Sequence, residues 1–561
     1  MRSRTLVLAI TTALLVGAGP AQAHSGGHHH HGHHHKRHKP RAVDVQLLSI
    51  NDFHGNLAPP GTLTLPGGVR TPAGGAEYLA THIDALRKQN RNTLVVSAGD
   101  NIGASPLVSG LFHDEPTIEA FNAMGVDISS VGNHEFDEGS AELLRMQDGG
   151  CHPVDGCQDG DGFAGADFDY LAANVTDDDT GRTLFRPYEI RRVGGVKVGF
   201  IGVVLKDTPT IVTPSGVEGL TFGDEADAIN KYTAKLKKKG VRAIVVLMHQ
   251  GDTVDLGQVN DCLNPVGPLA DIVGRSSKEV DLYLTGHTHQ AYNCVIGGKR
   301  ATSASSFGRV LTDANLRVDR RTGQVVSVSA ENEIVTQDVA KDPAQTAILD
   351  KYTTIAAPIA NRRIGASTAA LTREQNAAGE SVLGDIIADS QLAATAPDGF
   401  GNAVVAFMNP GGIRTDIDAG DITYGEAFAV QPFGNSLVTM TLTGAQIDRV
   451  LEQQWDGQGT SPKVLQVSNG LTYTWSASGP LGSRVDPSTI KINGTTVDPA
   501  ASYRVTVNSF LADGGDGFTE LRNGTDRLGG AVDLDALAAY LSLPANDPIA
   551  PTPRDRITVA P

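Results

Sequence analysis

The chain has 561 residues, of which 40% are hydrophobic, and it carries a formal net charge of −17. This length exceeds the size at which a single hydrophobic core stops growing, so at least two domains are expected. The acidity argues against a protein that binds nucleic acid by neutralising phosphates, and we expect no stable nucleic-acid partner. An acidic surface instead favours cations.

The first 23 residues predict a secretory signal peptide. They combine a basic start at Arg2 and Arg4, an apolar run from Leu6, and a small-residue end with cleavage expected after Ala23. A membrane anchor is the alternative, but the apolar run is short and ends in Gly and Pro. We find no later run long enough to span a bilayer. The sequence therefore predicts a secreted, soluble protein without a membrane anchor.

Residues 24–42 predict a disordered segment that attracts metal ions. Nine of the 17 histidines lie between His24 and His38, and residues 24–39 contain no apolar side chain that could build a core. A purification tag is the alternative, although Gly32 interrupts the run. The segment is expected to play no part in catalysis.

Five apolar segments of the first half each end in a tight loop with polar side chains. Helical patterns at 75–89 and 225–240 separate some of these segments, which indicates an α/β fold with ligands at the carboxyl ends of the strands of one sheet. Each loop alone is more often structural than functional, but five in succession are hard to explain as turns. The segments are 43–50 (followed by Asp52 and His54), 92–98 (Asp100), 126–131 (Asn133, His134 and Asp137), 241–248 (His249) and 280–285 (His287 and His289).

The chemistry of these side chains indicates a metal centre. Asp, Asn and His without Cys suit divalent ions such as zinc or manganese. They are too numerous for one tetrahedral ion, whereas two ions that share a bridging carboxylate would use them all.

The four cysteines of a secreted chain allow three disulfide pairings. Cys151 and Cys157 flank a small loop and are predicted to pair with each other. Cys262 and Cys294 would then form the second disulfide. No cysteine lies beside a catalytic partner in the sequence, so all four are interpreted as structural.

The second half begins after a helical stretch at residues 338–363, which we interpret as an interdomain linker. Short strands are predicted at 403–409, 436–444 and 502–509. They indicate a second α/β domain over residues 364–561.

The order Asp-x-His, Gly-Asp, Gly-Asn-His-Glu, His and Gly-His-x-His resembles the calcineurin-like metallophosphoesterases. The stretches "MNPGGIR", "QPFGN" and "FLADGGDGF" resemble the C-terminal domain of the secreted bacterial 5′-nucleotidase family. The resemblance covers nearly all of the mature chain. It implies a calcineurin-like α/β/β/α sandwich with a dinuclear metal site at residues 43–337 and a C-terminal α/β substrate-binding domain.

The resemblance also implies a role for each ligand. Asp52, His54 and His289 would hold the first ion. Asn133, His249 and His287 would hold the second, and Asp100 would bridge the two. Some family members have Gln or Asn in place of His289, and a histidine is also a competent ligand.

The same resemblance gives His134 and Asp137 a catalytic role. His134 would face the substrate phosphate, and Asp137 would hold its ring, since a carboxylate on one ring nitrogen fixes the tautomer. A cap of the helix predicted at 138–147 is the alternative role for Asp137. Glu135 is expected to face elsewhere and receives no role.

Substrate-binding residues are expected in the second domain. Arg414 would bind phosphate oxygens, with an exposed salt-bridge arginine as the alternative. Phe433 and Phe510 would stack on a base, although for either one alone a core position is the commoner role. The further candidates are Asn409 and Asn435 for the base or ribose, Asp516, and Arg373 as a weaker phosphate ligand.

These observations predict a secreted two-metal phosphohydrolase. It would release phosphate from nucleoside 5′-monophosphates by attack of a metal-bound water. The alternatives are hydrolysis of nucleoside diphosphates or nucleotide sugars, and 2′,3′-cyclic-nucleotide phosphodiesterase activity. A different class is an extracellular metal-scavenging protein built on the His-rich segment. The sequence leaves open the metal, the leaving group and the oligomeric state.

Overall fold

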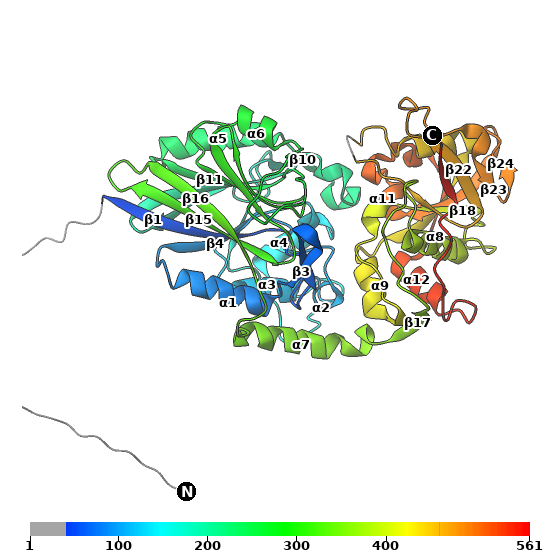
Figure 1. Ribbon diagram of the computed structural model, residues 1–561, viewed down its shortest axis with the longest axis horizontal. Helices are drawn as coiled ribbons and strands as arrows, with labels where there is room; N and C mark the ends of the chain where they lie inside the picture. Colours follow the sequence, from blue (N-terminus) through cyan, green and yellow to red (C-terminus); the bar gives the residue numbers. More distant parts are fainter. Residues whose placement is uncertain (1–40, 459–460, 561) are drawn as a thin grey trace, which may run out of the picture. The chain divides into compact units, whose positions relative to one another are not determined.

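The computed structural model describes residues 41–458 and 461–560, which belong to one compact unit (Figure 1). The predicted signal peptide and nearly all of the His-rich segment lie outside these residues. In the described part of the chain, every helix falls short of the length and apolarity needed to cross a membrane.

The first half contains two six-stranded mixed sheets. In the first sheet β1, β4, β5 and β6 run parallel, and β15 is antiparallel to β1. Its strands, in spatial order, are β16 (Val325–Ile334), β15 (Val310–Asp319), β1 (Ala42–Ile50), β4 (Thr93–Ser97), β5 (Ile128–Ser130) and β6 (Asp169–Leu171).

In the second sheet β14, β12, β11 and β9 run parallel, and the outer strands are antiparallel to their neighbours. Its strands, in spatial order, are β13 (Ala291–Ile296), β14 (Lys299–Ala304), β12 (Leu282–Thr285), β11 (Ala243–His249), β9 (Val196–Val204) and β8 (Tyr188–Val193).

The two sheets pack face to face over a core that contains Val45 and Val96 of the first and Val198 and Val245 of the second. Helices cover the outer faces: α1 (Ala76–Arg87), α3 (Glu115–Met124) and α4 (Ser140–Asp148) on one side, α5 (Glu225–Lys238) and α6 (Leu269–Arg275) on the other. Figure 1 shows α1 and α3 on one side of the strands and α5 and α6 on the other. The predicted α/β/β/α sandwich is confirmed.

The expectation that all five ligand-bearing strands share one sheet is wrong. β1, β4 and β5 belong to the first sheet, whereas β11 and β12 belong to the second. Strands buried on both faces read as apolar runs in either sheet, so the pattern does not reveal which strands are neighbours. The sandwich nevertheless brings the carboxyl ends of strands from both sheets to a common edge.

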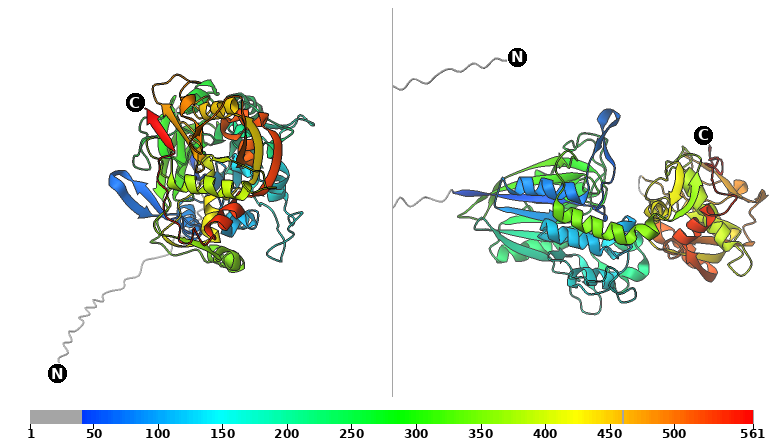
Figure 2. Two further views of the ribbon diagram at one scale, coloured as in Figure 1. Left: turned by 90° about the vertical axis from the view of Figure 1, so that its right-hand side faces the viewer. Right: turned by 90° about the horizontal axis from the view of Figure 1, so that it is seen from below.

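Smaller elements complete this half. The hairpin of β2 (Thr62–Leu65) and β3 (Val69–Pro72) projects from the rest of it in both views of Figure 2. β7 (Val175–Asp177) pairs with β10 (Leu220–Phe222). Both predicted disulfides are confirmed, with Cα–Cα distances of 4.7 Å for Cys151–Cys157 and 5.2 Å for Cys262–Cys294.

Helix α7 (Pro343–Ala360) lies inside the stretch interpreted as the linker, and the Asp342 side chain caps its first turn. Its residues Tyr352 and Ala356 pack against Phe112 of the first half. The exact domain boundaries stay predictions.

The second half is an α/β domain, as predicted. Its main sheet has the order β21 (Gln466–Val467), β18 (Val405–Met408), β25 (Ser502–Asn508), β20 (Ser436–Thr443) and β26 (Thr525–Val532). Two small sheets join β24 (Thr495–Thr496), β23 (Lys491–Ile492), β22 (Leu471–Ser476) and β27 (Ile557–Ala560), and β17 (Arg363–Ser367) with β19 (Gly420–Thr423). The helices are α8 (Val382–Thr395), α9 (Tyr424–Val430), α10 (Gly444–Glu452), α11 (Ser509–Ala512) and α12 (Asp533–Leu541).

Candidate active site

The predicted ligands stand in loops whose backbone is unusual for their residue types. Their φ values are 50° for Asp52, 47° for His54, 52° for Asp100, 75° for His287 and 57° for His289. Such left-handed conformations cost about 1–2 kcal/mol per residue relative to the right-handed form for side chains other than Gly. The loops are therefore held by their surroundings and not by local preference.

The glycines of the motifs make room for these ligands. A Cβ on Gly286 would lie 3.0 Å from Oδ2 of Asp52, and one on Gly132 would collide with the Asp100 carboxylate. The Gly-Asn-His and Gly-His motifs are thus explained by close approach to the two aspartates.

The side chains of this region form three groups of candidate metal ligands. One joins His54, Asp100 and His134, and the other two follow the division expected between two ions. Asp52, His54 and His289 offer ligand atoms within 4.8 Å of one another, and so do Asp100, His249 and His287.

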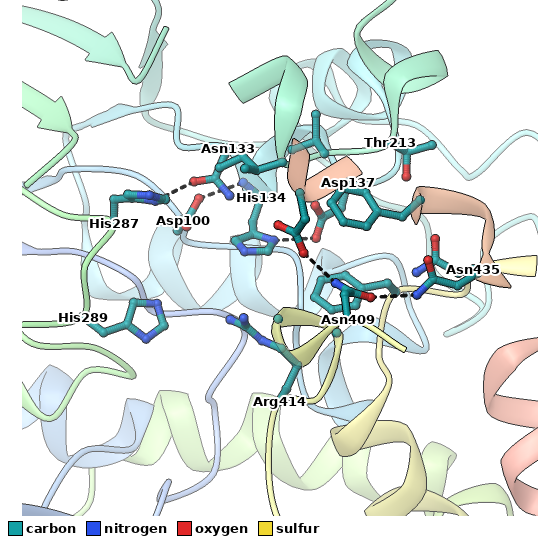
Figure 3. A pocket seen from close by; sticks show the side chains of 18 of the residues that line it. Asp100, Asn133, His134, Asp137, Thr213, His287, His289, Asn409, Arg414 and Asn435 are labelled. Atoms are coloured by element: carbon teal, nitrogen blue, oxygen red, sulfur yellow. Dashed lines mark hydrogen bonds and ion pairs between the residues drawn. The ribbon is translucent and has the colours of Figure 1, made fainter. Parts of the chain in front are cut away.

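The Asp100 carboxylate lies between these groups. Its Oδ2 is 2.9 Å from Nε2 of His249 and 3.7 Å from Nε2 of His54. Asn133 joins the second group, because its Oδ1 lies 3.0 Å from Nδ1 of His287 (Figure 3).

Hydrogen bonds to backbone carbonyls set the tautomers of two histidines. His54 Nδ1 donates to the carbonyl of Gly103, and His249 Nδ1 donates to that of Ala98, each at 2.8 Å. Because a carbonyl can only accept, the Nε2 atoms of the neutral rings carry lone pairs. Nε2 of His249 is buried and lies 2.9 Å from Oδ2 of the Asp100 carboxylate. Lone pairs that face each other in this way fit a cation, so the donor set suits the metal centre.

Burial also sets the charge of the histidines. It lowers the pKa of His54 to about 3, and burial together with His249 lowers that of His287 to about 3. Both rings are therefore neutral at pH 7, the form that binds metal. Burial opposes the charge on His249, but Asp100 outweighs it and raises the pKa to about 9. A proton thus competes with a cation at His249.

Two side chains that received no role from the sequence support the ligand loops. Glu135 is 3% exposed; its Oε2 accepts hydrogen bonds from the backbone N–H of Asp100 at 2.9 Å and of Gly132 at 2.6 Å. Asn51 donates to Oδ2 of Asp52 at 2.6 Å and to the carbonyl of Ser305 at 2.7 Å. In the sequence, the only sign of this supporting role is that Glu135 and Asn51 lie next to predicted ligands in the motifs.

His134 and Asp137 form the predicted pair, with 2.8 Å between Nδ1 of His134 and Oδ2 of Asp137 (Figure 3). Burial opposes the charged form of His134, but Asp137 and Asp100 outweigh it and raise its pKa. The cap of α4 is Gly139, without a side-chain hydrogen bond, so the alternative role for Asp137 is not observed.

A cavity of about 450 Å³ joins the ligands to the second half of the chain. Both phenylalanines are half-buried on its wall, and Phe510 also packs against the hydrophobic core of the second half. All the predicted substrate-binding residues line it: Arg373, Asn409, Arg414, Phe433, Asn435, Phe510 and Asp516. So do Asp100, Asn133, His134, Asp137, His287 and His289, and, outside the prediction, Asn508 and residues 211–213.

Comparison with known proteins agrees with this architecture. Residues 45–291 match the sequence model of the family described as calcineurin-like phosphoesterase, and residues 361–523 match that of the 5′-nucleotidase C-terminal domain. The chain belongs to the 5′-nucleotidase family. Its members are metal-dependent hydrolases of phosphate esters, and the calcineurin-like domain uses two divalent ions.

Relatives of this 5′-nucleotidase family member carry several names. Endonuclease YhcR of Bacillus subtilis is 34% identical over 97% of this chain and 43% of its own length, and cell wall protein Lmo0130 of Listeria monocytogenes is 34% identical over 86% and 64%. The chain thus spans less than two thirds of either relative. The crystal structure of a 5′-nucleotidase precursor from Thermus thermophilus has a TM-score of 0.75 and 28% identity, covering 92% of this chain and 99% of that one.

The two arginines of this 5′-nucleotidase domain are placed differently. The guanidinium carbon of Arg414 lies 5.7 Å from the centre of the Phe433 ring, and burial lowers the pKa of Arg414. Figure 3 shows its side chain directed toward the metal-ligand side of the cavity. Arg373 instead donates to the carbonyls of Ile413 and Arg414, each at 2.8 Å, and so braces the loop that carries Arg414.

Two of the predicted base- and ribose-binding residues, Asn409 and Asp516, belong to one hydrogen-bonded network, and Asn435 makes a separate hydrogen bond. Asn409 donates to Oδ2 of Asp516 at 2.9 Å and accepts from Asn508 at 3.0 Å, so both ends of its amide are engaged. Lys463 donates to Oδ1 of Asp516 at 2.6 Å. Asn435 accepts from the Ser509 hydroxyl at 3.0 Å. Neither Asn508 nor Lys463 belongs to a motif that would have predicted its place.

Proposed function

We propose that this chain hydrolyses nucleoside 5′-monophosphates with two divalent ions, zinc or manganese. One observation carries the proposal: a single cavity is lined by four of the seven candidate metal ligands and also by Phe433, Phe510 and Asp516. Its volume of about 450 Å³ falls in the range of about 300–1,000 Å³ usual for small-molecule sites. A phosphate and an aromatic base could occupy it together.

In this proposal Asp52, His54 and His289 hold one ion, and Asn133, His249 and His287 hold the other, with Asp100 shared. When bound, the two ions supply Lewis acidity, which makes water nucleophilic near neutral pH and withdraws charge from the phosphoryl oxygens.

The residues of the chain stabilise the same charge. Because Asp137 engages Nδ1 of His134, the other ring nitrogen is free to donate a hydrogen bond to a phosphoryl oxygen. Arg414 adds a guanidinium on the facing wall of the cavity. The two phenylalanines offer flat faces to the base, and Asp516 offers oxygens to the ribose hydroxyls.

A phosphate-release screen tests the proposal. AMP, ADP, UDP-glucose, 2′,3′-cyclic AMP and a small aryl phosphate are compared with zinc and with manganese. We expect the highest kcat/KM for AMP. Preference for ADP, UDP-glucose or the cyclic nucleotide would replace the proposal by one of the alternative activities. An aryl phosphate cleaved as well as AMP would remove the case for nucleotides.

We also propose that the protein is secreted. The two disulfides suit an oxidising compartment, and one relative is named a cell wall protein. Sequencing the N-terminus of protein from the culture medium should place the cleavage after Ala23. Protein retained in the cytoplasm with its first residues intact would contradict this.

The metal-scavenging alternative concerns residues 24–39, which lie outside the described residues. Deleting them should leave hydrolysis unchanged. Loss of zinc capture without loss of hydrolysis would show that the tail has a separate metal-binding function.

A further inference from the structure

A separate group of candidate metal ligands lies outside this cavity. His113, His152 and Asp155 each offer a ligand atom within 4.8 Å of the others. His113 lies between α2 (Leu107–Gly110) and α3, and the other two belong to the loop closed by the Cys151–Cys157 disulfide. No step proposed above uses them.

The two histidines face the same carboxylate. Oδ2 of Asp155 lies 2.9 Å from Nε2 of His113 and 3.2 Å from Nδ1 of His152. Nδ1 of His152 also accepts a hydrogen bond from the backbone N–H of Asp155 at 3.2 Å, which a bound ion would replace. Adjacent ligands of a tetrahedral zinc ion, with bonds of about 2.0–2.1 Å, are separated by roughly 3.3 Å. The imidazole rings stack with 3.7 Å between centroids, so the His152 ring must rotate to share an ion, which the broad χ2 distribution of histidine permits.

A carboxylate on the far side of the ring orients His113. Its Nδ1 lies 2.6 Å from Oε2 of Glu138. Histidines that bind metal commonly engage a carboxylate through their second nitrogen in this way.

The surroundings favour positive charge. A neighbouring cavity of about 360 Å³ is lined by six carboxylates and, among the described residues, by no Lys or Arg. The six are Asp114, Glu135, Asp137, Glu138, Glu142 and Asp535.

We propose that His113, His152 and Asp155 bind a third divalent cation of the zinc class, with Glu138 orienting His113. Asp155 and Glu138 together neutralise the two positive charges of the ion. The side chain of Asp155 is 45% exposed, so an ion can enter from solvent. The bound ion cross-links the α2–α3 corner, the disulfide loop and the turn that follows Asp137.

Zinc binding to the full-length chain tests this site. Equilibrium dialysis at fixed free zinc, followed by elemental analysis, compares wild type with His152→Ala and Asp155→Asn. Each variant should bind one ion fewer per chain. The control is His82→Ala, because His82 bonds the Thr336 carbonyl at 3.1 Å and belongs to none of the ligand groups. The His-rich segment is the same in all four proteins, so it cancels in the comparison.

Thermal melting gives an independent readout. Zinc should raise the Tm of wild type and of His82→Ala more than that of the two site variants. In the presence of a chelator, Asp155→Asn should have the same Tm as wild type, because the amide has nearly the shape of the carboxylate. If both site variants bind as much zinc as wild type and gain the same stability from it, the site does not exist.

Discussion

The Phe510→Ala substitution tests whether the second half of the chain binds the base of the substrate by stacking. The Phe510 ring is half-buried on the cavity wall and belongs to neither metal-ligand group. Removing it deletes one stacking face, worth about 1–3 kcal/mol per base in nucleic-acid complexes. At about 1.4 kcal/mol per factor of ten, kcat/KM for AMP should fall by roughly 5- to 150-fold.

The assay compares AMP with a small aryl phosphate that has no base to stack. The kcat/KM for the aryl phosphate should change little. The ratio of the kcat/KM values for the two substrates should therefore shift by nearly the whole effect. The matched control is Phe400→Ala, whose ring is 64% exposed and does not line the cavity. Equal losses on both substrates, or no loss on AMP, would refute the stacking argument.

Phe433→Ala should not show the same selectivity. Its ring lies 5.8 Å from the His134 ring, nearly parallel at 19°, and packs against Arg414. Removing this ring disturbs His134 and Arg414, which are expected to bind the phosphate of any substrate. The kcat/KM should therefore fall for both AMP and the aryl phosphate.

Three further substitutions separate ligand, catalytic and supporting roles. Asp100→Asn should nearly abolish hydrolysis, because an amide does not neutralise two cations. If metal analysis still finds two bound ions and turnover is near normal, Asp100 does not have the bridging role. His134→Ala should keep both ions while kcat falls by roughly 10²–10⁴, and loss of metal would instead make His134 a ligand. Glu135→Gln replaces an oxygen that accepts two backbone N–H groups. At about 1–3 kcal/mol per unpaired donor, the free energy of unfolding, measured in urea with the metals chelated, should fall by about 2–6 kcal/mol. A loss below about 1 kcal/mol would mean that the loops of Asp100 and Gly132 do not depend on it.

The positions of the candidate ligands could be located from the sequence because each lies just after a predicted strand. The apolar runs located the strands, and the polar residues after them located the ends. Sheet membership was not predictable, since β11 of the second sheet has the same buried pattern as the strands of the first. That assignment depends on packing between residues far apart in the chain.

The supporting residues escaped prediction for a related reason. Glu135 lies inside a motif, but its work is to accept backbone N–H groups of a loop that begins 35 residues earlier. Lys463 reaches Asp516 across 53 residues. The candidates on the cavity side of the second half depended on the family resemblance for their roles, since a core position is commoner for a single Phe. The hydrogen bonds of Arg373 to backbone carbonyls became visible only in the fold.

The left-handed backbone at the candidate ligands has an evolutionary consequence. Asp52, His54, Asp100, His287 and His289 all adopt φ values that glycine adopts without steric penalty. If these side chains hold metal as proposed, selection for hydrolysis keeps them in place despite the strain. In a lineage released from that selection, glycine is the replacement that relaxes the backbone at each of these positions. Homologues in such a lineage should therefore carry glycine at these five positions, while the sandwich around them stays folded.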